Sequence, residues 1–537
     1  MINLPLCMSA GGDRKNIGKE VFVMAGKSTT PTCCLTLPLR LEKWQADRLE
    51  KRFEIARQIY NTLLRFELKK LNRFENSEAY LELKAKIQEQ REKTDDETKQ
   101  IKELFKQLNK LRSDAGFSEY SFKTDIKEFY KHFNQNIKSH VAVHGIAPQV
   151  WQAFERYFSG KGKTVHFKKR GELYSLRGYS TAHKSGGTEI MFKGDHLEWS
   201  GLVLPLKIDQ KNSYEADMLK KRVKYCRIVK RPGKRAPHWY AQLLLEGTPT
   251  VKFDKTGKIE KHPVGSGNVG IDIGPQTIAY ASETEVGLKE LADRVQNIEN
   301  EKRILQRKMD RSRRATNPDN YAKDGTIKRG VKLTKNKSKR YLRCQKELAW
   351  LQHRQADIRK QQHNELANHL MALGNRFYVE KMEWPSLTHR AVKTEISEKT
   401  GKYKRKKRFG KSVGNKAPAT LISLLDQKLR TRGYEGVIKV DPRKMRASQY
   451  NHLTGEYQKK ELSERWNRMP DGRRIQRDLN SAFLLQHTND EQNGFIQAEL
   501  EEDYGAFTQM HDAVIQTLKA NPKTITSMGI PRTSNKH

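Results

Sequence analysis

Three acidic residues stand where local structure would hold a carboxylate in place. Asp272 lies in the apolar run G-I-D-I-G, Glu380 ends the run F-Y-V-E, and Asp478 begins a helix predicted over 478–486. A charge in an otherwise apolar strand is unfavourable unless it is paired or binds a metal. Three carboxylates from two strands and a helix suit Mg²⁺, which prefers oxygen ligands and keeps positions open for phosphate. Two such ions, about 3.5–4 Å apart, activate a water and stabilise the leaving oxygen of a phosphodiester.

Each carboxylate also has a purely structural interpretation. Asp272 would then be a structural residue at a strand-to-turn junction, and Asp478 a first-turn acid favoured by the helix dipole. Glu380 would pair with a nearby lysine, with Glu383 as a rival for its role. The three together, in this order along a strongly basic chain, favour a nuclease site.

The elements that would position these carboxylates alternate between strands and helices. The spacing of apolar residues predicts a basic helical stretch over about 288–373, interrupted at 316–337, and a helix over 419–432. Short runs rich in β-branched and aromatic residues predict strands over 268–273, 277–281, 376–380 and 436–440. We therefore expect an α/β domain in the second half of the chain.

The first half of the chain has a different pattern. A strand is predicted at Cys33–Leu41, followed by a long helix whose apolar face carries Leu49, Phe53, Ala56, Tyr60 and Leu63. A second apolar face consists of Ile101, Leu104, Leu108 and Leu111, which gives a helical lobe over about 42–160. β signals then follow at 164–167, 189–192, 196–199, 223–229 and 238–245. They predict a small β-barrel or sheet domain ending near Pro263.

The charge balance restricts the class of partner. Lys plus Arg number 104 against 63 Asp plus Glu, a formal net charge of +41, which indicates a polyanionic partner. The five cysteines show no C-x-x-C spacing, so neither a disulfide framework nor a cysteine zinc site is indicated, and we expect a cytoplasmic, reducing location. No apolar run approaches the roughly 20 residues of a membrane span, so no membrane partner is expected. The first 31 residues lack a signal-peptide core and are interpreted as a poorly ordered leader.

The runs around the three carboxylates resemble the RuvC motifs of the transposon-encoded TnpB proteins and the related compact type V CRISPR effectors. G-I-D-I-G resembles the first motif, V-E-K-M the second, and Q-R-D-L-N-S-A the third, which is the most specific. Ala482 lies one helical turn after Asp478 and would permit close packing on the strand of Asp272. The resemblance implies that Asp272, Glu380 and Asp478 are catalytic residues that bind Mg²⁺, with two ions expected.

The resemblance covers roughly residues 32–487 and implies a multidomain α+β fold. A helical recognition lobe would be inserted in a wedge β-barrel, followed by an RNase H-like (RuvC) α/β domain with a zinc-free ribbon-like insertion. The implied order is a flexible leader at 1–31, a wedge strand at 32–41, the helical recognition lobe at 42–160, the wedge β-barrel at 161–263, the first part of the RuvC domain at 264–444, a ribbon-like hairpin for target nucleic acid at 445–474, the third motif at 475–490 and a C-terminal helix and tail at 491–537.

The same resemblance implies nucleic-acid contacts away from the carboxylates. A-R-Q-I-Y-N at 56–61 resembles the family's first long helix, V-H-F-K-K at 165–169 its helix-to-barrel junction, and S-K-R-Y at 338–341 a basic bridging helix. The candidate nucleic-acid-binding residues are Arg57, Tyr60, Asn61, Lys168, Lys169, Lys339, Arg340 and Arg477.

The chain departs from the family pattern between the second and third motifs. The family usually inserts a zinc ribbon there, and the positions of its four cysteines are occupied by Asn451, Thr454, Arg468 and Asp471. A structural zinc needs four good ligands, so no zinc is expected. We predict a hairpin held by apolar contacts of Trp466, Leu453 and Met469, with His452 as a satisfied surface residue.

The function implied by the resemblance is that of an RNA-guided DNA endonuclease. A guide RNA would pair with the target strand, while the protein reads a short adjacent motif in the double-stranded target DNA. One alternative is a nuclease-dead RNA-guided repressor, which would be expected to lack one or more of the carboxylates. The other is a DDE-type transposase, whose acids typically follow the order Asp, Asp, Glu, whereas this chain has Asp, Glu, Asp.

Overall fold

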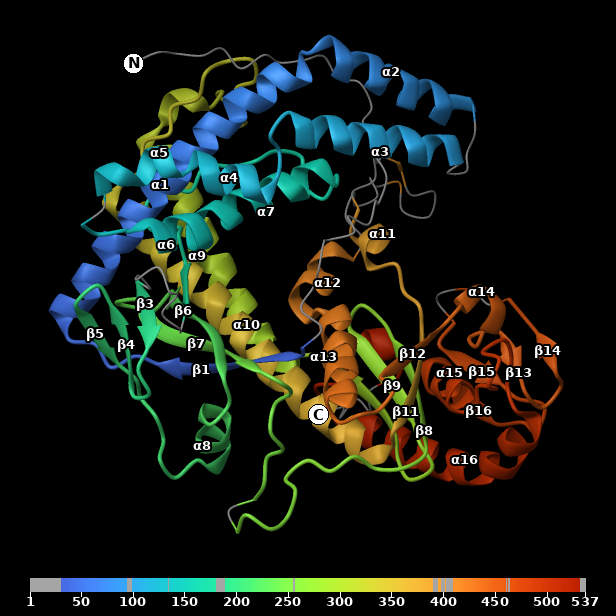
Figure 1. Ribbon diagram of the computed structural model, residues 1–537. Helices are drawn as coiled ribbons and strands as arrows, with labels where there is room; N and C mark the ends of the chain where they lie inside the picture. Colours follow the sequence, from blue (N-terminus) through green and yellow to red (C-terminus); the bar gives the residue numbers. More distant parts are fainter. Residues whose placement is uncertain are drawn as a thin grey trace. The chain divides into compact units, whose positions relative to one another are not determined.

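A computed structural model describes residues 30–93, 99–133, 135–179, 189–254, 256–389, 395–396, 401, 409–459, 461 and 464–531. The chain divides into two units, Met1–Thr250 and Val251–His537, and each combines helices with sheets (Figure 1). The predicted multidomain α+β class is therefore confirmed. Of the predicted leader, all but the last two residues lie outside the described part. Among the residues described, no helix has the length and apolarity that crossing a membrane requires.

The first unit begins with a strand and a long helix, as predicted. Strand β1 (Thr32–Pro38) is followed by α1 (Lys43–Glu75), where the side chain of Gln45 accepts a hydrogen bond from the backbone N–H of Glu42 at 2.7 Å. The five apolar residues expected on the inner face of α1 are all buried. The remaining helices of this part are α2 (Glu78–Lys93), α3 (Lys99–Asp114), α4 (Glu119–Asp125), α5 (Lys127–Tyr130), α6 (Ser139–Val141) and α7 (Ala147–Phe158), with single turns at Lys131–Phe133 and Ala142–Ile146.

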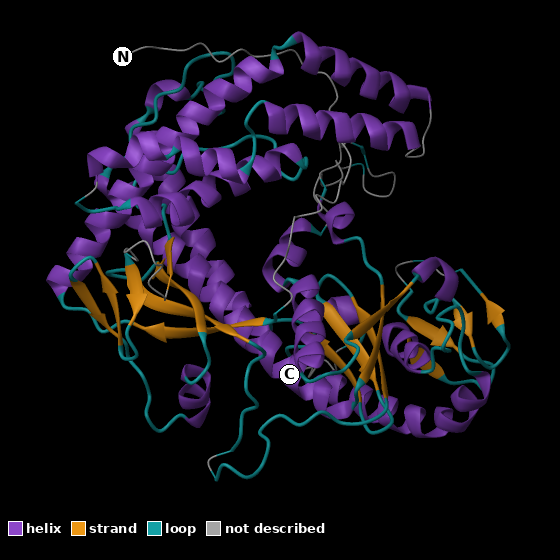
Figure 2. Ribbon diagram, viewed as in Figure 1, coloured by secondary structure: helices purple, strands orange, loops and turns teal. Residues whose placement is uncertain are grey.

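The strands of the first unit form two antiparallel sheets, drawn in orange in Figure 2. One has the order β1-β7-β6-β2 and the other the order β3-β4-β5. Leu35 of β1 lies opposite Leu243 of β7, so the helices between them are an insertion in the first sheet. The strand bounds are β2 (Ser175–Tyr179), β3 (Ile190–Phe192), β4 (His196–Trp199), β5 (Leu202–Pro205), β6 (Val223–Arg231) and β7 (His238–Glu246), with α8 (Ser213–Leu219) between β5 and β6.

The strand predictions for the first unit were wrong at three places, and one of these is β5, which was missed. The segment 164–167 forms no strand, because the chain after it is bonded to α1 instead of to a sheet. The N–H of Lys168 donates to Asn61 Oδ1 at 2.9 Å, and its carbonyl accepts from Asn61 Nδ2 at 2.8 Å. Strand β2 was missed, and it contains Gly178, where a Cβ would lie 2.3 Å from the Cβ of Ile190. The close approach of β3 therefore requires glycine there.

The second unit is built on a five-stranded mixed sheet of order β10-β9-β8-β11-β12. The first three strands in this order are antiparallel, and β8, β11 and β12 are parallel. Strands β8 (Asn268–Ile273), β9 (Thr277–Ala281) and β11 (Arg376–Glu380) have the predicted bounds, and β12 (Val437–Val440) differs by one residue. Strand β10 (Val286–Glu290) lies where a helix was expected to begin, which is a correction.

Helices cover both faces of this sheet. Val269, Ile271 and Ile273 of β8 pack with α10 (Lys339–Leu373) and α13 (Pro418–Thr431). The opposite face packs against α15 (Arg477–Gln486) and α16 (Gln497–Ala520). Figure 1 shows α13 and α15 on the two sides of the strands. Because side chains alternate along a strand, Gly270 and Asp272 belong to the face of α15.

The remaining elements of the second unit are short, except for one long helix. Helix α9 (Gln296–Thr316) packs along α10, and the break between them falls where the sequence predicted it. The others are α11 (Trp384–Thr388), α12 (Gly410–Lys416), α14 (Pro442–Met445), the hairpin strands β13 (Tyr450–Asn451), β14 (Glu456–Tyr457), β15 (Trp466–Arg468) and β16 (Arg474–Gln476), and single turns at Asp293–Val295, Pro318–Asn320 and Thr526–Met528.

The predicted ribbon-like region consists of the two hairpins β13–β14 and β15–β16. Met469 is buried there, as expected, but Leu453 is 36% exposed. His452 is only 1% exposed and neither ring nitrogen has a hydrogen-bond partner, so its interpretation as a satisfied surface residue was wrong. Its ring packs instead against Tyr504 of α16, with centroids 4.7 Å apart.

Candidate active site

Asp272 and Glu380 stand side by side at the carboxyl ends of two parallel strands. Ile271 of β8 is paired with Val379 of β11, so the next residue on each strand is Asp272 and Glu380. Neighbouring strands lie about 4.7–4.9 Å apart, which keeps the two backbones close. Both residues lie on the sheet face that packs against α15, and both are partly buried.

Asp478 approaches the same place from the first turn of α15. A Cβ at Gly270 would lie 2.0 Å from the carbonyl oxygen of Ala482 and 2.3 Å from the N of Gln486, so only glycine permits this contact. The helix backbone therefore rests directly on β8. Since Asp272 lies two residues after Gly270, and Asp478 one helical turn before Ala482, the two acids meet where β8 ends and α15 begins.

The electrostatics of Asp272 show how closely these groups are associated. Burial raises its pKa well above the usual range, and the negative charges of Asp478 and Glu380 raise it further. Arg477 and Arg465 oppose this shift. Burial also raises the pKa of Glu380, against a hydrogen bond accepted from the backbone N–H of Ala447. Such repulsion between acids is relieved when a cation binds between them.

Two arginines contact Asp478. Arg465 Nη1 lies 3.5 Å and Arg477 Nε lies 3.6 Å from Asp478 Oδ1, and the Asp478 side chain is 13% exposed. Arg477 also donates from Nη1 to the carbonyl of Glu464 at 2.8 Å, which fixes its guanidinium. Arg477 was a predicted site residue, whereas Arg465 was missed, because no motif marks it.

The donor set fits a hard divalent cation in its chemistry. All three side chains offer carboxylate oxygens, and their mutual repulsion favours a positive charge among them. In the described part of the chain, no three His, Cys, Asp or Glu side chains are already gathered at ligand distance. The three carboxylates repel one another because they have like charges, and the Asp478 side chain faces two arginines. The carboxylates therefore need a side-chain rearrangement to share an ion.

Glu383 does not compete for the position of Glu380. It is exposed and stands at the start of α11, beyond the end of β11. It is not among the groups that raise the pKa of Asp272. Of the two candidates for the second carboxylate, Glu380 is the one beside Asp272.

Four of the predicted nucleic-acid-binding residues meet at one junction of the first unit. Arg57 Nη1 donates to the carbonyl of Lys168 at 2.9 Å, in addition to the bonds between Asn61 and Lys168. Lys168 Nζ lies 4.5 Å from the ring centroid of Tyr60, and burial raises the pKa of that tyrosine to about 12. Arg57 is also paired with Glu54 at 2.7 Å. These groups bind one another, and nucleic-acid contact remains a prediction for them.

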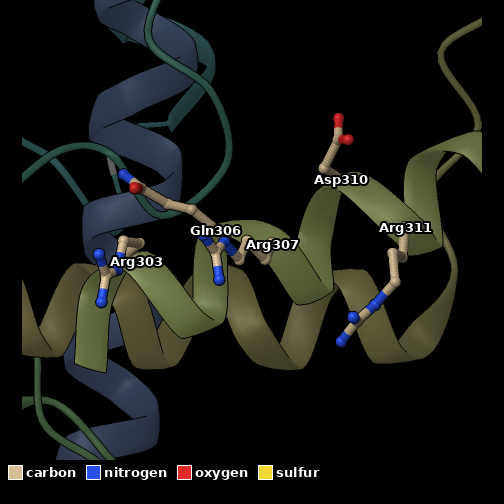
Figure 3. Close-up of a pocket in the computed structure, with 5 residues that line it drawn as sticks. All are labelled: Arg303, Gln306, Arg307, Asp310 and Arg311. Atoms are coloured by element: carbon tan, nitrogen blue, oxygen red, sulfur yellow. The ribbon is translucent and has the colours of Figure 1, made fainter. Parts of the chain in front are cut away.

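The other predicted basic residues, Lys169, Lys339 and Arg340, are exposed. A further basic surface lies on α9, within the basic helical stretch predicted over about 288–373, although its arginines were not named as candidates. Arg303, Arg307 and Arg311, here called the arginine row, recur every four residues and leave the helix on one side, while Asp310 points away from them (Figure 3). They border a hollow of about 400 Å³ and form no ion pair with another described residue. Successive members are about 6 Å apart along the helix.

Comparisons with known proteins gave distant structural likenesses, two of which are described below. No family model matches the chain, and no curated protein matches its sequence. The chain is similar to the cryo-EM structure of a Cas12f1–sgRNA–target DNA complex, with a TM-score of 0.35 and 12% identity over 86% of this chain and 99% of that chain. It is also similar to the cryo-EM structure of a CRISPR–Cas12f ternary complex, with a TM-score of 0.23 and 13% identity over the same shares. A likeness of this degree does not by itself identify an activity.

Proposed function

We propose that this protein is a metal-dependent, RNA-guided DNA endonuclease. The observation that carries the proposal is the placement of three carboxylates, Asp272 and Glu380 on adjacent strand ends and Asp478 on the helix that packs on them. Carboxylates with a purely structural role would not need to be placed where they repel one another. The mixed sheet, with three antiparallel strands followed by two parallel ones, supports an RNase H-like RuvC domain.

The three carboxylates would hold the Mg²⁺ ions, two in number as the resemblance implies. Bound divalent ions supply Lewis acidity and an activated water for phosphodiester hydrolysis. Asp272 and Glu380 are held in register by the β8–β11 pairing, and Asp478 by the rigid first turn of α15. Arg465 and Arg477 offset part of the negative charge, and their guanidinium groups suit the oxygens of an incoming phosphate.

The basic surface supports a nucleic-acid partner. The net charge of +41 and the arginine row give a polyanion many phosphate contacts, and α9 offers them without disrupting ion pairs. Such contacts fix the position of a duplex but do not read its sequence. Sequence recognition would therefore come from a guide RNA paired with the target strand, with the protein reading a short adjacent motif of the target duplex.

We also propose that the ribbon-like hairpins function without zinc. The four positions at which the resembled family has cysteines are held by Asn451, Thr454, Arg468 and Asp471. Asp471 Oδ2 accepts a hydrogen bond from the hydroxyl of Tyr504 at 3.1 Å, so this carboxylate has a protein partner. The packing of the His452 ring against Phe483 of α15 and Tyr504 of α16 supports a hairpin that does not require a metal.

Sequencing the RNA that co-purifies with the chain tests the guided mechanism. We expect one structured RNA species with a variable end, and Mg²⁺-dependent cleavage of duplexes that match that end. Asp478→Asn should bind the same RNA and target without cutting, because it removes one metal ligand. Sequence-specific cutting by rigorously RNA-free protein would refute guidance and favour readout by side chains. Guided binding without cutting by the wild-type chain would instead indicate a nuclease-dead repressor.

A further inference from the structure

Gln476, the residue that precedes the helix of Asp478, is held entirely by hydrogen bonds. Its side chain is fully buried, and its Oε1 accepts from the backbone N–H of Leu479 at 2.8 Å as the N-cap of α15. Its Nε2 donates to the carbonyl of Met528 at 3.2 Å, and its backbone N–H donates to His511 Nε2 at 3.0 Å. Two of these three bonds come from residues 497–531, here called the C-terminal segment, which comprises α16 and the chain after it.

The protonation of His511 follows from its partners. A backbone N–H can only donate, so Nε2 of His511 is the unprotonated acceptor and the ring proton sits on Nδ1. Nδ1 lies 2.9 Å from Asp512 Oδ1, which accepts that proton. The imidazole is 1% exposed and is packed edge-on against Trp466, with ring centroids 6.2 Å apart. The ring is therefore fixed in both tautomer and orientation.

The chain after α16 approaches the site from a second direction. The Gly529 carbonyl accepts from Trp466 Nε1 at 2.8 Å, and Met528 and Ile530 are buried in the core under the sheet. Gly529 has φ +70, and a Cβ there would lie 2.3 Å from the Cβ of Arg465. Arg465 in turn contacts the Asp478 carboxylate. The segment therefore packs on the residue that touches the acid.

We propose that the C-terminal segment is a positioning element of the candidate active site, with His511 and the Met528 carbonyl fixing the first turn of α15 and thereby the carboxylate of Asp478. Asp478 lies two residues after Gln476, and the Arg477 N–H is bonded to the Arg465 carbonyl at 2.9 Å. The two residues that precede Asp478 are thus both held by hydrogen bonds to other parts of the chain. The effect of this element on metal binding by Asp478 rests on the proposed function, whereas its effect on the position of the first turn of α15 does not.

A matched pair of substitutions tests the hydrogen bond from Gln476 to His511. His511→Gln keeps an acceptor oxygen at about the reach of Nε2, and His511→Met has about the same length but offers only a thioether sulfur, which is a weak acceptor. The first measurement is amide hydrogen exchange of the peptide 474–482 in the full chain without Mg²⁺. A buried N–H that loses its strong acceptor should exchange on the order of tenfold faster, so we expect this in the Met variant and near wild-type exchange in the Gln variant.

The second measurement is the Mg²⁺ concentration for half-maximal cleavage of a guide-matched duplex. We expect the Met variant to need on the order of tenfold more Mg²⁺, because the hydrogen bond from Gln476 to residue 511 is weakened there. The Gln variant should be close to wild type. Ile515→Val, also buried on α16 but not bonded to Gln476, is the control and should change neither measurement. Gly529→Ala, which displaces the other arm of the element, should reproduce the Met variant.

The outcomes separate the positioning from the function. If the Met and Gln variants exchange alike, the acceptor has no role and the inference fails. If exchange rises while the Mg²⁺ requirement does not, the segment holds the helix without positioning Asp478, which also overturns it. If the wild-type chain never cuts, the proposed function fails, while hydrogen exchange still decides whether His511 holds Gln476.

Discussion

Asp272→Asn should stabilise the protein in the absence of metal while abolishing its activity. The folded chain buries Asp272 beside Asp478 and Glu380, which raises the pKa of this carboxyl well above its usual range. In the unfolded chain it titrates near its ordinary value of about 3.9. Between these two pKa values the folded state binds more protons than the unfolded state, so the stability falls as the pH rises through that window. Asparagine removes the charge and keeps the shape.

The expected gain at pH 7 is on the order of 1–2 kcal/mol in the free energy of unfolding, the usual size for relieving strain at a functional site. For a unit of this size that corresponds to a rise in Tm of about 2–4 °C per kcal/mol. The gain should vanish below about pH 3.9, where the wild-type carboxyl is protonated in both states. Mg²⁺ should raise the Tm of the wild-type chain and leave that of the variant nearly unchanged.

Thermal unfolding of both proteins at pH 7 with EDTA, and again with Mg²⁺, measures these effects. Asp490→Asn is the matched control, because the Asp490 side chain is 92% exposed and its ion pair with Arg376 is worth little. A destabilised Asp272→Asn variant at pH 7 would refute the reasoning, because the carboxylate would then contribute to the fold through a favourable contact. An equal Mg²⁺ response in both proteins would remove Asp272 from the metal site.

Four further predictions follow from the same geometry. Glu380→Gln should abolish Mg²⁺-dependent cleavage while Glu383→Gln retains it, and a reversed result in the cleavage assay would show that the second carboxylate is misassigned. Replacing the arginine row with glutamine should weaken duplex binding and reduce the magnitude of the slope of log K against log salt concentration by about two to three. An unchanged slope would exclude phosphate contacts there. His452 is buried with its pKa lowered to about 4, so wild-type stability should fall as pH drops from about 6.5 to 4, by on the order of 3 kcal/mol more than in His452→Phe, as measured by denaturant titration. Elemental analysis of protein purified without chelator should give zinc well below one equivalent, and stoichiometric zinc would overturn the metal-free hairpin.

The parts predictable from sequence are those with strong local patterns. β8 and β11 have the expected bounds because each is a short β-rich run with a single acid, Asp272 next to the end of β8 and Glu380 at the end of β11. The long helix α1 was predicted because its apolar residues keep helical spacing over about four turns. β8 and β11 carry two of the three carboxylates. Predicting that Asp272 and Glu380 are adjacent therefore required only the assumption that these two strands pair in parallel.

The parts not predictable depend on contacts between distant residues. Strand β10 contains Gly287, where a Cβ would lie 2.3 Å from the ring of Tyr280, so tertiary packing selects the residue rather than strand propensity. His452 was predicted to lie on the surface because the side chain that buries it belongs to α16, some fifty residues later in the chain. His511 lies 35 residues from Gln476 and belongs to no motif, so its role was visible only once both positions were known.

The pairing of β1 with β7 has a consequence for synthesis on the ribosome. Leu35 pairs with Leu243, which is synthesised 208 residues later. At ordinary translation rates of about 5–20 residues per second, the interval between the two is about 10–40 s. During that time Cys33, Leu35 and Leu37, all buried in the finished sheet, have no partner strand. A strand edge exposed in this way is prone to pair with another chain. Within the described part of the chain, the first strand to leave the ribosome is thus among the last to enter its sheet, and we expect the nascent chain to depend on a chaperone over this interval.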